Sequence, residues 1–238
     1  MNAVLGSKYH VEYGNNISLV PGMKDKFERL GLATHLGIKL AAKHKSVEGI
    51  VKPQIERIQG TTEKVRRLAS DLSRNPTQRH LVAQALAKEL DADLRRTHDR
   101  VAGVADNMIA EAESGIHRVL GARADNGWMY ASAFQWFREV GTDAIGLKNI
   151  SEAVREDLTL AQAVFNGPRQ IMGFGKDTHM TMREGIAKKW VRDEWAQLNE
   201  GLDVQKSLSN YVPLIGDIHG AYYNPAVIDQ SEASRVEV

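Results

Sequence analysis

The residues of this 238-residue chain that could do chemistry are histidines, carboxylates and tryptophans, because the sequence contains no cysteine. That absence excludes cysteine nucleophiles and thiolate metal sites, and it is typical of proteins made in a reducing compartment. Glu113 stands one helical turn before His117, and Asp217 stands two residues before His219. The eight histidines are otherwise scattered, without a His-Glu-x-x-His or paired Glu-x-x-His motif. We therefore predict neither a metal nor a cofactor.

The pentapeptide Gly216-Asp217-Ile218-His219-Gly220 follows a short apolar stretch. It resembles the first metal-binding motif of calcineurin-like metallophosphoesterases, and this resemblance implies Asp217 and His219 as metal ligands. That family also needs later Asp, Asn and His motifs, which residues 221–238 do not supply, and a repeating strand–helix pattern. We therefore interpret the pentapeptide as a turn in an extended segment.

A second resemblance involves Glu113-Ser114-Gly115, followed by Gly121-Ala122 and Gly127-Trp128-Met129. These elements resemble those of lysozyme-like lytic transglycosylases. The resemblance implies a helical enzyme that cleaves cell-wall polysaccharide with Glu113 as general acid. Here the spacing from the glutamate to Gly-Ala is shorter than in that family, and Glu113 lies on a strongly helical run. A cell-wall lytic enzyme using Glu113 is kept as an alternative function.

The charge and hydropathy of the chain limit which classes of partner it can bind. Lysine and arginine total 31 and aspartate and glutamate 30, so the net charge is +1 and no global basic field attracts nucleic acid. Basic clusters at Lys39–Lys45 and Lys64–Arg67 leave a helical adaptor or nucleic-acid-associated regulator as a further alternative. No apolar stretch approaches the roughly 20 residues of a membrane span. We predict no membrane span and synthesis in the cytoplasm.

The clearest element is a long helix from the N-cap Asn75 and Pro76 to a stop at Gly121. Its length is roughly 45 residues, more than a compact domain of this size needs. Its apolar positions form one stripe with a mean spacing of about 3.7 residues, near that of an undistorted helix. The stripe comprises Val82, Leu86, Leu90, Leu94, His98, Val101, Ala105, Met108, Ala112, Ile116 and Val119.

Shorter helices are predicted on both sides of this long one. They run from Lys24 to about Lys45, from Pro53 to about Ser73, from Trp128 to Val140, from Asn149 to about Phe165, and from Thr181 to about Leu208. The second of them carries a heptad seam of Ile55, Ile58, Thr62, Val65, Ala69 and Leu72. It forms an antiparallel hairpin with the long helix but is too short to cover it. From about Val101 onward, the stripe must therefore pack on the C-terminal helices or on another copy of the chain.

The two ends of the sequence are predicted to be extended arms. Tyr9, Val11 and Tyr13 alternate with polar residues before a Gly14-Asn15-Asn16 turn signal, whereas residues 210–238 contain proline and glycine at intervals. The predicted fold is all-α, a long helical hairpin plus a C-terminal helical subdomain with two arms. The predicted regions are 1–22 (arm), 23–121 (hairpin), 122–209 (aromatic-rich helices) and 210–238 (arm).

The long, half-covered helix and the arms favour a non-enzymatic structural or assembly protein. Such a protein would pack as a homo-oligomer or dock on other structural proteins of a larger complex. A virus-particle component, such as a core, connector, scaffold or ejection protein, is the hypothesis within this class. Tryptophans at helical spacing are typical of core or interface anchors. The predicted interface residues are Val101, Met108, Ile116, Trp128, Trp136, Trp190, Tyr222 and Tyr223.

Overall fold

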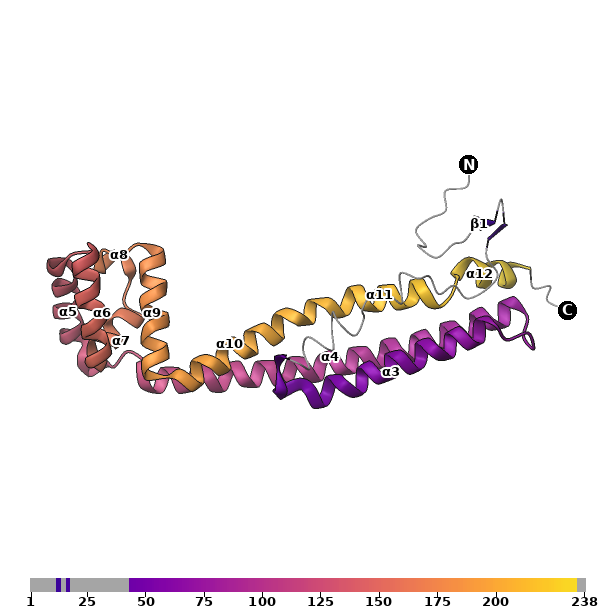
Figure 1. Cartoon of the computed structure of the whole chain (residues 1–238), viewed down its shortest axis with the longest axis horizontal. Helices are drawn as coiled ribbons and strands as arrows, with labels where there is room; N and C mark the ends of the chain where they lie inside the picture. The colour runs from indigo at the N-terminus through magenta and orange to yellow at the C-terminus, as the bar shows by residue number, and fades with distance from the viewer. Residues whose placement is uncertain (1–11, 14–15, 18–42, 235–238) are drawn as a thin grey trace. The chain divides into compact units, whose positions relative to one another are not determined.

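A computed structural model describes residues 12–13, 16–17 and 43–234 of the chain. The predicted all-α fold with a long central helix is confirmed (Figure 1). The helices are α3 Lys45–Ala69, α4 Pro76–Leu120, α5 Gly127–Val140, α6 Ala144–Glu156, α7 Leu158–Asn166, α8 Arg169–Met172, α9 Lys176–Trp190, α10 Arg192–Ser207, α11 Tyr211–Tyr222 and α12 Pro225–Ala233. Single 3-10 turns lie at Ala124–Asn126 and Leu208–Asn210. The helix predicted from Lys24 lies almost wholly outside the described residues.

Near the N-terminus, two short antiparallel strands are described, β1 Glu12–Tyr13 and β2 Asn16–Ile17. Glu12 pairs with Ile17 and Tyr13 with Asn16. Gly14 and Asn15 of the predicted turn lie outside the described residues. The rest of the predicted N-terminal arm lies outside the described residues.

Both ends of α4 were predicted correctly because they are set by local chemistry. The backbone N–H of Gln78 donates to Oδ1 of Asn75 at 2.8 Å, and the N–H of Asn75 donates to Oε1 of Gln78 at 3.1 Å. This reciprocal capping box satisfies donors that a helix start leaves free. At the other end, the N–H of Gly121 donates to the carbonyl of His117 at 2.8 Å. The 45 residues between them form one helix.

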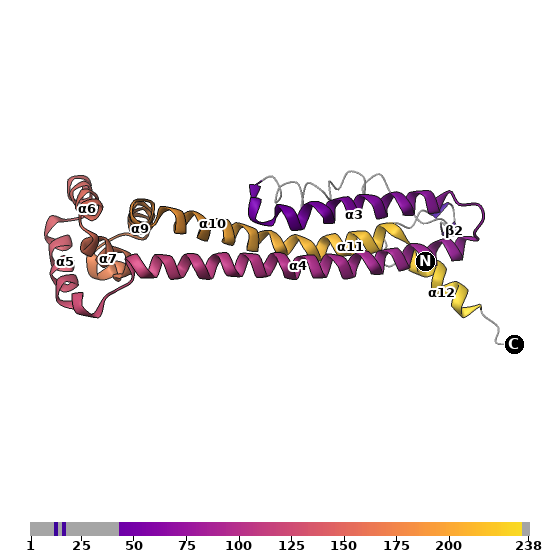
Figure 2. The same cartoon turned by 90° about the horizontal axis from the view of Figure 1, so that it is seen from below.

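The chain divides into two compact units, one of residues 1–104 and 203–238 and one of residues 105–202, so that α4 and α10 contribute to both. In the first unit, α3, the beginning of α4 and α11 lie side by side (Figures 1 and 2). Their shared core consists of Ile58, Val65, Leu68, Ala83, Ala87, Leu90, Leu94, Tyr211, Leu214, Ile218, Ala221 and Tyr222. Burial of this apolar surface is the main force that holds the three helices together.

Helix α3 corrects the prediction that a helix starts at Pro53. It begins eight residues earlier, at Lys45, and Pro53 lies inside it. Val47 and Val51 continue the buried face toward the N-terminus, so packing outweighs the helix-breaking tendency of proline. The predicted seam is right at Ile58 and Val65, which are buried, and wrong at its C-terminal end, because Leu68 is 7% exposed whereas Leu72, beyond the end of α3, is 93% exposed.

The segment after residue 210 is helical, so its predicted extended state was wrong. In α11, Tyr211, Leu214, Ile218 and Tyr222 recur every three or four residues and are buried against α3 and α4. Its glycines and its early proline do not prevent this, because tertiary burial of one face outweighs weak local propensity. Helix α12 then starts at Pro225, after the N-cap Asn224, whose Oδ1 accepts from the N–H of Ala226 at 3.0 Å.

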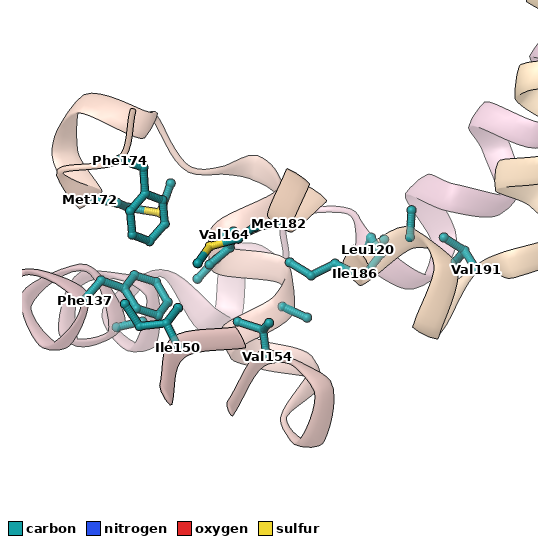
Figure 3. Packing of buried hydrophobic residues seen from close by; sticks show 14 of the residues in the cluster. Leu120, Phe137, Ile150, Val154, Val164, Met172, Phe174, Met182, Ile186 and Val191 are labelled. Atoms are coloured by element: carbon teal, nitrogen blue, oxygen red, sulfur yellow. The ribbon is translucent and has the colours of Figure 1, made fainter. Parts of the chain in front are cut away.

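The second unit is built from the end of α4 and from α5 to α10 (Figure 1). Its core gathers side chains from most of these helices, with Met172 and Phe174 lying over Phe137 (Figure 3). The labelled core residues are Leu120, Phe137, Ile150, Val154, Val164, Met172, Phe174, Met182, Ile186 and Val191. The ring centroids of Phe137 and Phe174 are 5.9 Å apart.

Helix boundaries within this unit differ from the prediction because other caps are used. Asp143 caps α6 by accepting from the N–H of Gly146 at 2.7 Å, so the capping-box pattern at Asn149 lies inside a helix. Asp157 accepts from the N–H groups of Thr159 and Leu160 and starts a new helix, α7. The predicted helix from Asn149 to Phe165 is therefore two helices.

The last predicted helix is likewise divided. Helix α9 begins at Lys176, before the capping-box pattern at Thr181, and it ends at Val191 with φ −144° and ψ 50°. Gly201 lies within α10 and packs on α4. A Cβ there would lie 2.9 Å from Cγ1 of Ile109 and 3.3 Å from the carbonyl oxygen of Ala105. The second half of the α4 stripe is thus covered by a C-terminal helix.

Candidate functional site

Two hollows of the second unit lie along α9. One, which we call the α6–α9 groove, has a volume of about 700 Å³. Its lining residues are Ala144, Leu147, Lys148, Ser151, Val154, Arg155, Asp177, Thr178, Thr181, Met182, Glu184, Gly185, Ile186 and Lys188. Asp143 sets the start of α6, and the left-handed Gly173, with φ +79°, turns the chain toward α9. These local signals place the two walls of the groove.

The second hollow, the α9–α10 groove, has a volume of about 740 Å³. Its lining residues are Glu184, Lys188, Arg192, Trp195, Ala196 and Asn199. Glu184 and Lys188 line both grooves, so the grooves meet at one turn of α9. The break at Val191 lets α10 leave in a new direction and bring Trp195 to this surface.

Apolar side chains form the floor of the α6–α9 groove. Val154, Met182 and Ile186 are buried members of the core of the second unit. The indole N–H of Trp190 donates to the carbonyl of Val154 at 3.0 Å and ties α9 to α6. The floor therefore belongs to a packed core, and its shape is set before any partner arrives.

The polar rim of the two grooves is mainly cationic. Lys148, Arg155, Lys188 and Arg192 line it, against the carboxylates of Asp177 and Glu184. Lys188 pairs with Glu184 at 2.6 Å. Among the described residues, no carboxylate lies within ion-pair distance of Arg155 or Arg192. These two guanidinium groups, one at each groove, are thus available to an anionic partner.

Glu113 lies at a smaller pocket of about 210 Å³ in the same unit, which shares Trp195 with the α9–α10 groove. The pocket is lined by Glu113, Ile116, His117, Gly121, Phe165, Asn166, Arg183, Trp195 and Leu198. The guanidinium of Arg183 lies over the ring of Phe165, 4.6 Å from its centroid, which is a cation–π contact. Glu113 is the one carboxylate among these lining residues. The pocket could hold a single ring or side chain between Trp195 and Arg183.

The pentapeptide Gly216–Gly220, predicted to be a turn in an extended segment, is helical instead. Asp217 and His219 lie within α11, where residues two apart point in different directions. His219 instead reaches Asp91 of α4, with Nε2 3.3 Å from Oδ2, and its Nδ1 lies 3.2 Å from the hydroxyl of Tyr223. Burial raises the pKa of Asp91, but hydrogen bonds from Arg95 and His219 outweigh it and hold that pKa below its ordinary value. His219 thus joins α11 to α4.

No group of three or more histidine, aspartate or glutamate side chains in the described part of the chain could hold a metal ion. The basic clusters seen in the sequence are largely paired. Lys43 contacts Asp203 at 2.7 Å, and Arg66 and Arg67 both contact Glu63. Lys39 lies outside the described residues. Among the described helices, none has both the length and the apolar character that crossing a bilayer needs.

The eight predicted interface residues fall into three groups by exposure. Val101, Ile116 and Tyr222 are covered by the chain's own helices, and the hydroxyl of Tyr222 lies 3.0 Å from that of Thr62. The partly covered residues are Met108, Trp136, Trp190 and Tyr223. Trp128 alone of the eight is an exposed large side chain, 72% accessible in the first turn of α5.

Sequence reasoning missed both grooves. Their cations come from three helices and are far apart in the sequence, so no motif connects them. The available signal was the spacing of four between Lys188 and Arg192, but Val191 interrupts the helix between them. Comparison of the chain with profiles of known protein families, with curated proteins and with solved structures gives no match.

Proposed function

We propose that this chain is a non-enzymatic structural or assembly protein, which packs against copies of itself or docks on a larger complex. The observation that carries the proposal is the exposure of large apolar side chains on different helices. Trp128 and Ile145 are each 72% exposed, and Val212 is 76% exposed. Tryptophan in particular is enriched where protein surfaces meet, because its large ring gains much from burial.

Light scattering on the purified chain tests this proposal. We expect a mass above the 26.4 kDa of one chain, and we expect it to fall toward that value when Trp128 is changed to serine. The matched control is Gln135→Ser, a change at an exposed polar position of the same helix. A rigid monomer at every concentration, unaffected by either change, would contradict self-association.

Within this class we propose a virus-particle component made in the cytoplasm. Its support is the helical, cysteine-free character of the chain, which is a likeness of architecture rather than of a motif. Mass spectrometry of purified particles tests it. The protein should be retained after washing in high salt, and its absence from particles made by the same cell would contradict this part of the proposal.

One observation favours the alternative of a cell-wall lytic enzyme. Glu113 lines a pocket together with the aromatic side chains of Trp195 and Phe165, and sugar-binding sites commonly combine a carboxylate with aromatic rings. Glu113→Gln keeps the shape but removes the acid. If the chain lyses cell walls, that variant should lose the activity, whereas equal lysis by both proteins would remove this alternative.

A further inference from the structure

The two grooves beside α9 meet at one turn of that helix, and the α6–α9 groove has an apolar floor. They share Glu184 and Lys188, which stand four residues apart on one face of α9. From this shared turn, one groove continues over Met182 and Val154, and the other continues to Trp195. The combined surface is far larger than a small anion needs. An apolar floor beside a charged rim suits an amphipathic helix lying in a groove.

The charges of the rim indicate the sign of the partner. Lys188 pairs with Glu184 at 2.6 Å and Lys148 pairs with Glu152 at 3.9 Å, so that the two arginines of the rim face the carboxylate of Asp177. Arg155 ends α6 and Arg192 starts α10, and neither contacts a carboxylate of the described residues. A partner with acidic groups on both sides of an apolar stripe would meet these two arginines. Such complementary charges select the partner and speed its association.

The same rim disfavours a nucleic acid. Asp177 and Glu184 lie among the cations, and their charges repel a continuous phosphate backbone. The floor of the α6–α9 groove is formed by the aliphatic and thioether side chains of Val154, Ile186 and Met182, which offer no stacking surface for bases, and Trp195 is the one aromatic side chain among the residues that line the two grooves. The side chains of the floor do match the leucine or valine stripe of an amphipathic helix.

We infer that the α6–α9 and α9–α10 grooves together bind an acidic amphipathic helix of a partner protein. Arg155 and Arg192 contact its carboxylates, and Val154, Met182, Ile186 and Trp195 contact its apolar face. This inference rests on the proposed docking function and specifies the partner's chemistry. It leaves Trp128 as a separate surface on α5.

The test uses the full chain and a fluorescent synthetic helix with glutamates flanking a leucine stripe. Anisotropy should show saturable binding, and replacing every glutamate by lysine in the peptide should weaken it on the order of ten-fold or more. The Arg155→Glu/Arg192→Glu variant should lose binding by a similar factor. The matched control is Arg118→Glu/Arg123→Glu, which makes the same charge change at exposed sites of the same unit outside the grooves and should bind normally.

A charge-exchange experiment distinguishes loss of the arginine contacts from misfolding of the variant. The lysine peptide should bind Arg155→Glu/Arg192→Glu more tightly than it binds the wild type, which a merely unfolded protein would not do. The inference is overturned if the acidic and basic peptides bind alike, if the control variant loses as much affinity, or if no acidic peptide binds. It is also overturned if a single-stranded oligonucleotide binds through the same arginines more tightly than the acidic peptide.

Light scattering on the same samples separates this result from the proposed function. If the chain self-associates but does not bind the acidic peptide, the inferred partner of the grooves is wrong and the proposed self-association stands. A monomer that binds the acidic peptide through Arg155 and Arg192 supports docking and contradicts self-association.

Discussion

Oδ2 of Asp93 lies 2.5 Å from Nε of Arg57, and the aspartate side chain is only 4% exposed. The guanidinium of Arg96 contacts the other carboxylate oxygen. Arg57 belongs to α3 and Asp93 to α4, so a buried charge joins the two arms of the helical hairpin. A buried carboxylate without a partner is strongly destabilising, because its desolvation is then not offset.

Removing both arginines should therefore lower the free energy of unfolding, because the buried carboxylate of Asp93 is left without a partner. The Arg57→Ala/Arg96→Ala variant is expected to lose about 3 kcal/mol of unfolding free energy. In an Asp93→Leu background, the same pair of changes should cost much less, because no buried charge remains. Urea unfolding of the four proteins gives the coupling directly. Equal losses in both backgrounds would show that the arginines stabilise the chain by packing alone.

Tyr211 provides a prediction at high pH. Its side chain is fully buried, and burial raises its pKa to about 12. A pKa raised in the folded state gives stability that is complete below the unfolded pKa of about 10 and is lost as the pH rises toward 12. Among the described residues its hydroxyl has no hydrogen-bond partner, so Tyr211→Phe should be neutral or stabilising near pH 7. The variant should lose less stability than the wild type on going to about pH 11.

Tyr222 is the matched comparison. Burial also raises its pKa to about 12, although the hydrogen bond with Thr62 opposes the shift. Tyr222→Phe should therefore weaken the alkaline loss as well, but it should cost about 1 kcal/mol at neutral pH through the missing hydrogen bond. Urea unfolding at both pH values measures these effects. Identical alkaline losses in all three proteins would contradict ionisation of buried tyrosines as the cause.

Gly201 allows α10 to approach α4 closely. Gly201→Val would place side-chain atoms against Ile109 and the backbone of Ala105, and we expect it to destabilise the chain by about 1–3 kcal/mol. Gly185→Ala is the control, since a Cβ there meets nothing within 4 Å and alanine favours a helix. Thermal unfolding should show a lower midpoint for the first variant only. Similar midpoints for both would show that the helices separate at little cost.

The C-terminal end of the predicted seam can be tested at Leu68, inside α3, and at Leu72, just beyond its end. Leu68→Ala should cost about 2–5 kcal/mol, because Leu68 packs in the core of the first unit. Leu72→Ala should change the unfolding free energy by no more than about 0.5 kcal/mol, because its side chain is in solvent. Denaturant unfolding compares them. The opposite order of losses would restore the heptad seam predicted from the sequence.

The sequence by itself determined the fold class and the ends of α4. Asn75, Pro76 and Gly121 act within one helical turn, so their effect does not depend on the rest of the chain. It also identified the stripe of α4, because an apolar period near 3.6 specifies a helix face whatever covers it. The same local logic failed where two signals competed, as at Asp143 and Asn149, since only one cap can start a given helix.

Tertiary structure decided which faces are buried and which side chains meet. The helical state of α11 depends on α3 and α4, where Tyr222 meets Thr62 across 160 residues of sequence. Gly201 of α10 likewise fits against Ala105 of α4, and the grooves arise only when α6, α9 and α10 are assembled. Burial free energy is gained only when distant segments come together, so no local pattern reports it. For this reason the sequence predicted the long helix of this protein but not the surface beside α9.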